Sequence, residues 1–288
     1  MSINANMTDT CQHFILTRFN LRIWRQDKHG SAVRTREWLE HRIDLFEKYC
    51  FPSIANQTCK DFEWIVLFDG KTPDEFRDRI SEYQVLCPQL VPVFVAPESG
   101  RYFRKVFQTE VLDRMNGERV VTTYLDNDDA LDIHFVEDLQ RRVKDLADGT
   151  FVYYSNGYQY FSDFGLLLRI TYNRNHFVSV VEAGDPGTVK TIYGYGSHYY
   201  IDKIPGARIE YVKDNPLWCE IVHKRNMDND AYYLSGTKMI RDEQTLRRDF
   251  SVDETPRHGF ALYVFRFIPR YIAVFFRRIK HFFFGRKW

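Results

Sequence analysis

The sequence predicts an α/β protein with a mostly parallel sheet, an antiparallel part in its C-terminal half and a basic amphipathic helical tail. Three observations lead to this class. Short apolar runs alternate with helical patterns up to about residue 146, which is typical of βαβ units and right-handed crossovers. From Phe151 the pattern changes to short aromatic runs separated by turn residues. From Thr255 to Trp288 the chain is basic and aromatic, without a single Asp or Glu.

The first elements can be placed from apolar spacing. His13 to Thr17 is a short apolar run and predicts the first strand. Apolar side chains then recur at helical spacing from Trp38 to Cys50, and Pro52 should end or bend that helix. Glu63 to Phe68 predicts a buried second strand that stops at Asp-Gly.

The next helix should begin with Thr72 as its N-cap, because Pro follows at the first helical position and a carboxylate three residues after the cap. The remaining elements of this half are a third strand, a helix, a fourth strand and an amphipathic helix, over 90–96, 103–115, 119–125 and 132–146. Further on, Ser155-Asn156-Gly157 and Ser162-Asp163-Phe164-Gly165 predict the turns of antiparallel hairpins.

Charge is distributed unevenly along the chain. The 288 residues carry a net charge of +1. The tail from Thr255 holds eight of the 40 basic residues, so residues 1–254 are left with a net charge of −7. An acidic body argues against a nucleic-acid-binding protein, whereas a basic aromatic end favours one anionic surface as partner. The five cysteines have no metal-ligand spacing, and the N-terminus lacks the pattern of a signal peptide, so a cytoplasmic protein is expected.

Polar side chains follow three predicted strands at their carboxyl ends. Arg18 and Asn20 follow the first strand, Asp69 the second and Asp126 the fourth. Ligands of open α/β sheets bind beyond the carboxyl ends of the strands. We therefore expect these residues to lie at one site.

The sequence Asp126-Asn127-Asp128-Asp129 directly after the fourth strand is its most informative feature. Neighbouring carboxylates repel one another and need a cation, and oxygen ligands suit Mg²⁺ or Mn²⁺. An EF-hand is excluded, because Leu131 stands where that loop requires Gly. A plainer alternative is that Asp128 or Asp129 caps the following helix. Since no lysine-bearing phosphate loop and no GxGxxG turn follows any predicted strand, a nucleoside diphosphate would have to be held through a metal.

Four segments carry a family resemblance. They are Phe14 to Asn20, Phe51 to Thr58 with Phe62 to Val66, Leu125 to Leu131 and Trp218 to His223. In these segments the chain resembles the rhamnosyltransferases of bacterial polysaccharide clusters, which are glycosyltransferases of the GT-A type with a Rossmann-like sheet. Tyr124 departs from the family pattern, where an Arg is expected before the Leu-Asp-Asn-Asp-Asp run.

The resemblance implies a nucleotide-sugar donor and a divalent ion, Mn²⁺ or Mg²⁺, which neutralises charge on the leaving diphosphate. It assigns Asp126 and Asp128 to ribose and metal contact, and His223 to the metal or phosphate shell. Asp69 matches the position that binds the base, and Arg18 and Asn20 lie where the donor is expected. The alternatives are a turn residue for Asp69, a surface ion pair for Arg18 and a plain surface histidine for His223.

The catalytic base that an inverting transfer needs is a carboxylate or histidine close to the acceptor hydroxyl. The candidates are Glu182, Asp185, His198 and Asp202, and general analogy places Glu182 and Asp185 first. Residues 182–187 are expected to form a loop, and His198 belongs to a Gly-Tyr-Gly-Ser-His segment expected to form a lid.

The predicted organisation is a transferase domain over 1–254 and a membrane-association tail over 255–288. Within the domain, 1–130 would bind the nucleotide and 131–254 the acceptor. In a helical tail, Arg266, Arg270, Arg277 and His281 share one face, which is typical of a helix lying at lipid headgroups. The expected partners are the donor, a glycan or lipid-linked acceptor and the inner face of the cell membrane. The alternative for the tail is a helix packed on the domain with its basic side in water.

Two other functions fit the same carboxylates. One is a noncatalytic scaffold that binds a nucleotide sugar or glycan in a polysaccharide assembly complex. The other is a metal-dependent phosphohydrolase, for which the sequence supplies no second strand with a catalytic carboxylate.

Overall fold

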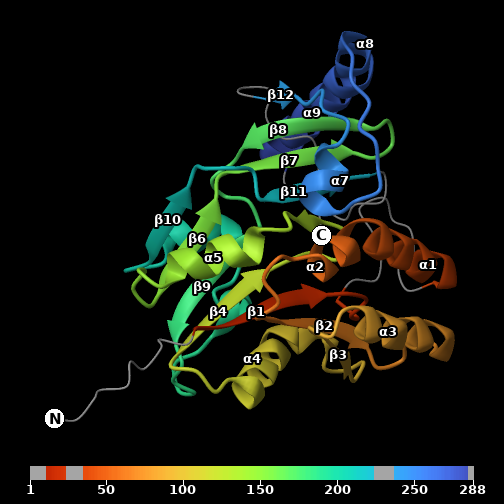
Figure 1. The fold of residues 1–288 in the computed structure, drawn as a ribbon. Helices are drawn as coiled ribbons and strands as arrows, with labels where there is room; N and C mark the ends of the chain where they lie inside the picture. Colours follow the sequence, from red (N-terminus) through yellow and green to blue (C-terminus); the bar gives the residue numbers. More distant parts are fainter. Residues whose placement is uncertain (1–10, 24–34, 224–236, 285–288) are drawn as a thin grey trace.

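Two sheets form the body of the protein in the computed structural model, which describes residues 11–23, 35–223 and 237–284 (Figure 1). The larger sheet has the strand order β10-β6-β9-β4-β1-β2-β3. Its strands are β1 (Cys11–Arg18), β2 (Glu63–Asp69), β3 (Leu90–Val95), β4 (Arg119–Tyr124), β6 (Thr150–Tyr154), β9 (Val178–Ala183) and β10 (Arg208–Val212). Strand β9 runs antiparallel to both its neighbours, and all other pairings in this sheet are parallel. The predicted mostly parallel α/β fold is confirmed.

Helices cover both faces of this sheet, which is why its central strands are apolar on both sides. Alternate residues of β1 show the division, since Ile15 packs with α1 (Arg36–Leu45), α3 (Asp74–Leu86) and α5 (Phe135–Val143). Phe14 and Leu16 face the other way, toward α4 (Phe103–Arg114) and α6 (Thr191–Gly194). Because β1 pairs in parallel with both β2 and β4, the carboxyl ends of these three strands lie at one edge of the sheet.

The helix before Pro52 continues past this proline and does not end there, which was one of the two outcomes expected. A π-helical turn (Phe46–Cys50) follows α1 and leads into α2 (Phe51–Ala55), which contains Pro52 in its first turn. Proline lacks a donor and crowds the carbonyl four residues earlier, and the wider π turn accommodates both effects. A second π-helical turn (Tyr263–Phe267) likewise precedes Pro269.

The prediction of Thr72 as an N-cap is wrong. Helix α3 begins at Asp74, with Pro73 in the capping position. The Thr72 hydroxyl instead donates to the Asp69 carbonyl oxygen and accepts from Asn20. Thr72 therefore fixes the turn after β2.

The smaller sheet has the order β12-β8-β7-β11-β5 and contains the predicted hairpin, β7 (Asn156–Phe161) and β8 (Leu166–Thr171). Its other strands are β5 (Ala130–Leu131), β11 (Trp218–Val222) and β12 (Lys238–Met239), with α7 (Thr245–Phe250) following β12 in the chain. The expected turn at 155–157 is absent, because Asn156 and Gly157 already belong to β7. A Cβ at Gly157 would lie 2.1 Å from the Trp218 ring, so this glycine serves close packing.

The tail is helical, as predicted. Helices α8 (Phe260–Leu262) and α9 (Ile268–Phe284) flank the second π-helical turn and stand at the top of the view in Figure 1. Phe267 is fully buried and contacts Phe161, so one face of this helix packs on the smaller sheet. In the described part of the chain, every helix is too short or too polar to span a bilayer.

Candidate active site

The acidic segment 126–129 is a loop that connects β4 of the larger sheet directly to β5 of the smaller one. Asn127, Asp128 and Asp129 are buried, and the side chain of Asp126 is 28% exposed. None of these side chains caps a helix, because α5 begins later, at Phe135. The carboxylates are therefore held by side chains from other segments.

Asp126 lies beside Arg18 at the end of β1. The Tyr124 hydroxyl donates to Asp126 Oδ1 over 2.9 Å, and Arg18 Nη2 donates to the same hydroxyl over 2.6 Å and to Oδ1 over 3.3 Å. The Arg18 guanidinium also lies 5.0 Å from the Phe103 ring centre and 5.3 Å from that of Tyr193. This aromatic setting fixes a cation next to Asp126.

Asp128 points to a different set of residues. Its Oδ2 accepts from Arg42 Nη1 and from His223 Nε2, each at 3.0 Å. Burial alone would raise the pKa of this carboxyl, but the Arg42 charge and the His223 contact hold it well below its usual range. Arg42 also donates to the Asn127 side-chain oxygen, and Asn127 donates to the Phe19 carbonyl oxygen over 2.9 Å. Asp128 is therefore an ionised carboxylate with a permanent counterion.

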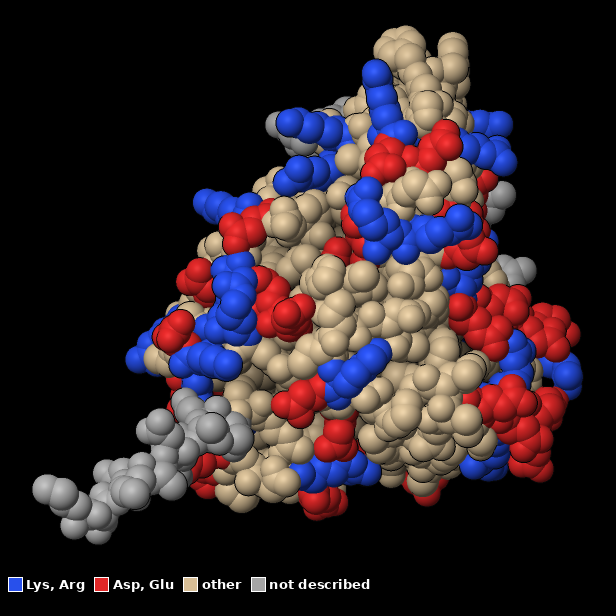
Figure 2. Space-filling view, viewed as in Figure 1, with Lys and Arg blue, Asp and Glu red and all other residues tan. Residues whose placement is uncertain are grey.

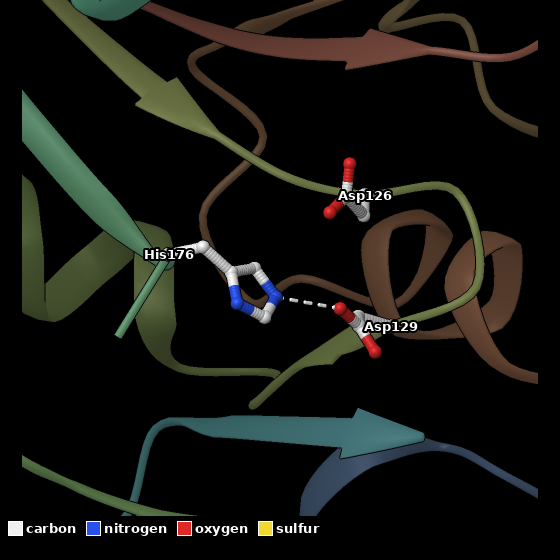
Figure 3. A group of neighbouring side chains, drawn as sticks. All are labelled: Asp126, Asp129 and His176. Carbon is white, nitrogen blue, oxygen red and sulfur yellow. Dashed lines mark hydrogen bonds and ion pairs between the residues drawn. The ribbon is translucent and has the colours of Figure 1, made fainter. Parts of the chain in front are cut away.

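Asp129 forms a third arrangement, with His176 from the segment between β8 and β9 (Figure 3). His176 Nε2 donates to Asp129 Oδ2 over 2.7 Å, and the other carboxylate oxygen accepts from the Ile221 amide over 2.8 Å. Burial would lower the pKa of His176, but Asp129, with further charge from Asp126, raises it to about 9. For the carboxyl of Asp129 burial acts in the opposite direction, and it is the main reason why the pKa of this group is raised.

Asp126, Asp129 and His176 are chemically suited to a divalent cation. Their ligand atoms all lie within 4.8 Å of one another. Among residues 11–23, 35–223 and 237–284, these three residues form the cluster of His, Cys, Asp or Glu side chains that could hold a metal ion. Two carboxylate oxygens, together with an imidazole nitrogen that gives up its proton, form a ligand set that Mn²⁺ accepts. The donor set therefore fits the expected metal.

Asp69 lies at the end of β2, on the same edge of the sheet. Its Oδ2 accepts from Arg22 Nε over 2.5 Å and its Oδ1 from the Lys71 amide over 2.9 Å. The side chain of Asn20 accepts from the Asp69 amide over 2.8 Å and donates to Thr72 over 3.0 Å. Both polar groups of Asn20 are thus used within the protein, where they join the ends of β1 and β2.

The structure brings His198 to the acidic loop. Its ring centre lies 5.9 Å from that of His176 and 6.5 Å from that of Tyr124. Burial, assisted by the charges of His176 and Arg18, lowers the pKa of His198 to about 3, so the ring is neutral. Asp202, four residues later, forms an ion pair with Arg174.

Glu182 and Asp185 are not brought to this site. Glu182 belongs to strand β9 rather than to a loop, and it pairs with Val120 at the amino end of β4, whereas Asp126 follows the carboxyl end. Its carboxylate accepts from the Lys190 and Thr191 amides over 2.8 and 3.0 Å. Because β9 is antiparallel, the segment that follows it lies at the opposite edge of the sheet.

Sequence reasoning missed two residues of the site. Arg42 carried a usable signal, because it lies four residues from both Trp38 and Phe46 on the apolar stripe of its helix. A charged residue on a stripe that faces the core needs a buried partner. His176 carried no comparable signal, since it lies in the polar segment Asn-Arg-Asn-His.

Solved structures that resemble this chain include S. aureus TarS 1-349, with 12% identity and a TM-score of 0.41 over 73% of this chain and 60% of that one. The same fragment in complex with UDP gives 12% identity, a TM-score of 0.39 and the same coverage. A 4-diphosphocytidyl-2C-methyl-D-erythritol synthase gives 13% identity and a TM-score of 0.35 over 71% of this chain and 89% of that one. The chain thus spans 60% of the length of the TarS fragment. No curated protein matches it.

A family model provides the assignment. The model described as "Putative rhamnosyl transferase" matches residues 13–233, which include the acidic loop and every side chain described around it. The match extends from within β1 to just beyond β11, so it covers the larger sheet except for the first two residues of β1. This chain belongs to the family that this model describes.

Proposed function

We propose that this protein is a metal-dependent, inverting glycosyltransferase that moves rhamnose from a nucleoside diphosphate donor to a glycan or lipid-linked acceptor in bacterial surface polysaccharide synthesis. The sugar follows from the description of the family. The observation that carries the rest is the acidic loop after β4, which lies at the same edge as Arg18 and Asp69. The alternative is a scaffold that binds the same ligand without catalysis.

The donor would lie across the carboxyl ends of β1, β2 and β4. Asp69 would accept a hydrogen bond from the nucleoside base. Arg18 and Arg22, the second of which contacts Asp69, would attract the diphosphate. Asp126 would contact the ribose and the metal, and Asn20 would keep Asp69 in position. A bound divalent ion neutralises negative charge that develops on the departing diphosphate.

In the transfer, the acceptor oxygen forms a bond to the anomeric carbon while the bond from that carbon to the diphosphate breaks. The acceptor hydroxyl loses its proton in this step, and His198 is the predicted base that lies beside the acidic loop. Its ring is neutral and can accept a proton. Burial is the main cause of its lowered pKa, and an anionic donor would offset only the smaller contributions of the charges on His176 and Arg18.

The tail would hold the enzyme at the cytoplasmic face of the cell membrane. Figure 2 shows a tip without charged residues at the α8 end, with Lys and Arg side chains just below it. Phe260, Phe265 and Phe276 are 78%, 74% and 62% exposed, although the opposite side of the helix packs on the protein. Exposed Arg266 and Lys280 accompany them. Exposed aromatic and basic side chains on one helix are what an anionic lipid surface attracts.

Isothermal titration tests donor binding. Wild-type protein should bind one nucleoside diphosphate sugar in the presence of Mn²⁺, and Asp126→Asn should weaken this binding by about 10- to 100-fold. Asp145→Asn, a change of an acidic residue after α5, serves as the control and should bind as wild type. Equal binding by Asp126→Asn and wild type would contradict the proposed site.

Liposome sedimentation tests the tail. Replacing Phe265 and Phe276 by Ser should release the protein from anionic vesicles without changing donor binding. Val85 and Leu86, which are 81% and 70% exposed at the end of α3, provide the matched control. Unchanged sedimentation of the tail variant, or equal release of the α3 control, would refute a specific membrane contact.

A further inference from the structure

Thr191, the first residue of α6, has a strained backbone. In the described part of the chain, two residues other than glycine have a positive φ, Thr191 at 62° and Ser251 at 54°. Ser251 follows the last turn of α7, where a left-handed residue commonly ends a helix. Thr191 instead begins a helix and is fully buried, and its branched side chain makes this conformation costly. Such strain persists only where surrounding contacts hold the backbone in place.

The side chain of Glu182 supplies these contacts. Its Oε1 accepts from the Lys190 amide over 2.8 Å and from the Tyr195 hydroxyl over 2.9 Å, and its Oε2 accepts from the Thr191 amide over 3.0 Å. The next amide along the chain donates to the Thr122 hydroxyl oxygen over 2.8 Å. Glu182 is 4% exposed, so water competes little for its oxygens. Three donors on one buried carboxylate therefore fix this turn.

The fixed turn leads directly into Tyr193, which lies at the proposed donor site. The Tyr193 ring stacks on that of Phe107, with ring centres 4.8 Å apart, and lies 4.7 Å from the ring centre of Tyr124. Its centre is also 5.3 Å from the guanidinium carbon of Arg18. An aromatic face attracts a guanidinium and stacks against it, so Tyr193 helps to fix the orientation of Arg18.

We propose that Glu182 is a positioning residue for diphosphate binding, because it holds the turn that keeps Tyr193 against Arg18. The inference rests on the proposed function for the role of Arg18. A guanidinium binds phosphate oxygens through a planar fork of N–H donors, so its orientation decides how many hydrogen bonds it makes. Glu182 pairs with Val120 near the amino end of β4, so its effect on the donor passes through Tyr193. The residue that the sequence suggested as a catalytic base thus acts from the opposite edge of the sheet.

Phenylglyoxal labelling of the full-length protein, with mass spectrometry of the peptide that contains Arg18, tests the first step without a ligand. Glu182→Gln places an amide N–H group against backbone donors, so it should release the turn and raise the labelling rate of Arg18 about threefold or more. Tyr195→Phe removes only one of the three donors and is the milder variant if Glu182→Gln fails to fold. It should raise the rate by a smaller factor, and no rise in either variant would overturn the proposal.

Asp242→Asn is the matched control for the labelling. The carboxylate of Asp242 also accepts from a turn amide, that of Gln244, but it does so before α7. This variant should label Arg18 at the wild-type rate. A rise equal to that of Glu182→Gln would show that general loosening of the protein, and not the turn before Tyr193, exposes Arg18.

Isothermal titration with UDP and uridine, which differ only in the diphosphate, tests the second step. Glu182→Gln and Tyr193→Leu should each weaken UDP binding about 10-fold, as expected when a hydrogen bond to a charged group is lost, and leave uridine binding unchanged. The double variant should lose no more than either single variant, because both changes act on the same contact. Losses that multiply, or equal weakening of uridine binding, would overturn the role of Glu182.

The two measurements separate this inference from the proposed function. If wild type binds UDP and Glu182→Gln binds it equally well, only the inference is contradicted. If Arg18 labelling follows the predicted pattern but wild type binds no nucleotide, the proposed function is contradicted, and the positioning of Arg18 by Glu182 is supported.

Discussion

Replacing His13 by Gln should remove a defined part of the acid sensitivity of this protein. His13 lies in β1 and is 1% exposed, and its Nε2 lies 2.8 Å from the hydroxyl oxygen of Thr123. Burial lowers the pKa of His13 from 6.5 to about 3. The folded protein therefore keeps this ring neutral at a pH at which the unfolded chain protonates it.

The sign and size of the effect follow from proton linkage. Between pH 6.5 and about 3 the unfolded state binds more protons at His13, so the free energy of unfolding falls as the pH falls. At about pH 5.5, one unit below the unfolded value, the loss is about 1.4 kcal/mol relative to about pH 7.5. Gln can keep a hydrogen bond to Thr123 but has no proton equilibrium in this range.

Urea unfolding of wild type and His13→Gln at these two pH values measures the effect. The fall in unfolding free energy should be about 1.4 kcal/mol larger for wild type. The comparison cancels the other titrating groups and any constant destabilisation by the substitution. The same pH dependence in both proteins would show that His13 is not held neutral by burial.

Two further predictions concern packing. Gly157→Ala should destabilise the protein by about 1–3 kcal/mol in urea unfolding, because a Cβ there meets the Trp218 ring at 2.1 Å. Gly187→Ala, where the nearest atom is 3.5 Å away, should cost much less, and equal losses would contradict this reading. Phe267→Ala should speed hydrogen exchange in the tail helix, since Phe267 is fully buried, whereas Phe265→Ala at a 74% exposed position should not. Equal exchange in all three proteins would show that the helix is not held by Phe267.

Much of the larger sheet could be predicted because its signals are local. Runs such as 63–68 and 119–125 are apolar on both faces, which is typical of buried parallel strands. Once strands and helices alternate, the rule for carboxyl ends brings Arg18, Asp69 and Asp126 to one edge without any contact being known.

The remainder depended on long-range contacts. His176 meets Asp129 across 47 positions, and Arg42 meets Asp128 across 86, and no local pattern encodes either pair. Glu182 was misplaced because the reversed direction of β9 was not visible in the sequence, so the loop after it was expected at the wrong edge. A long-range contact was also missed in the tail. The sequence predicted that Arg270 faces lipid headgroups, but its Nη1 atom lies 3.4 Å from Asp163 Oδ2 of the domain.

Release of nucleoside diphosphate from a rhamnose donor tests the central claim most directly. Purified protein with Mn²⁺ and a polysaccharide or lipid-linked acceptor should release it, and should do so slowly with water alone. Asp126→Asn should lower the rate by at least about 100-fold. Donor binding without release by wild type would indicate a scaffold, and an undiminished rate in Asp126→Asn would contradict catalysis at the acidic loop.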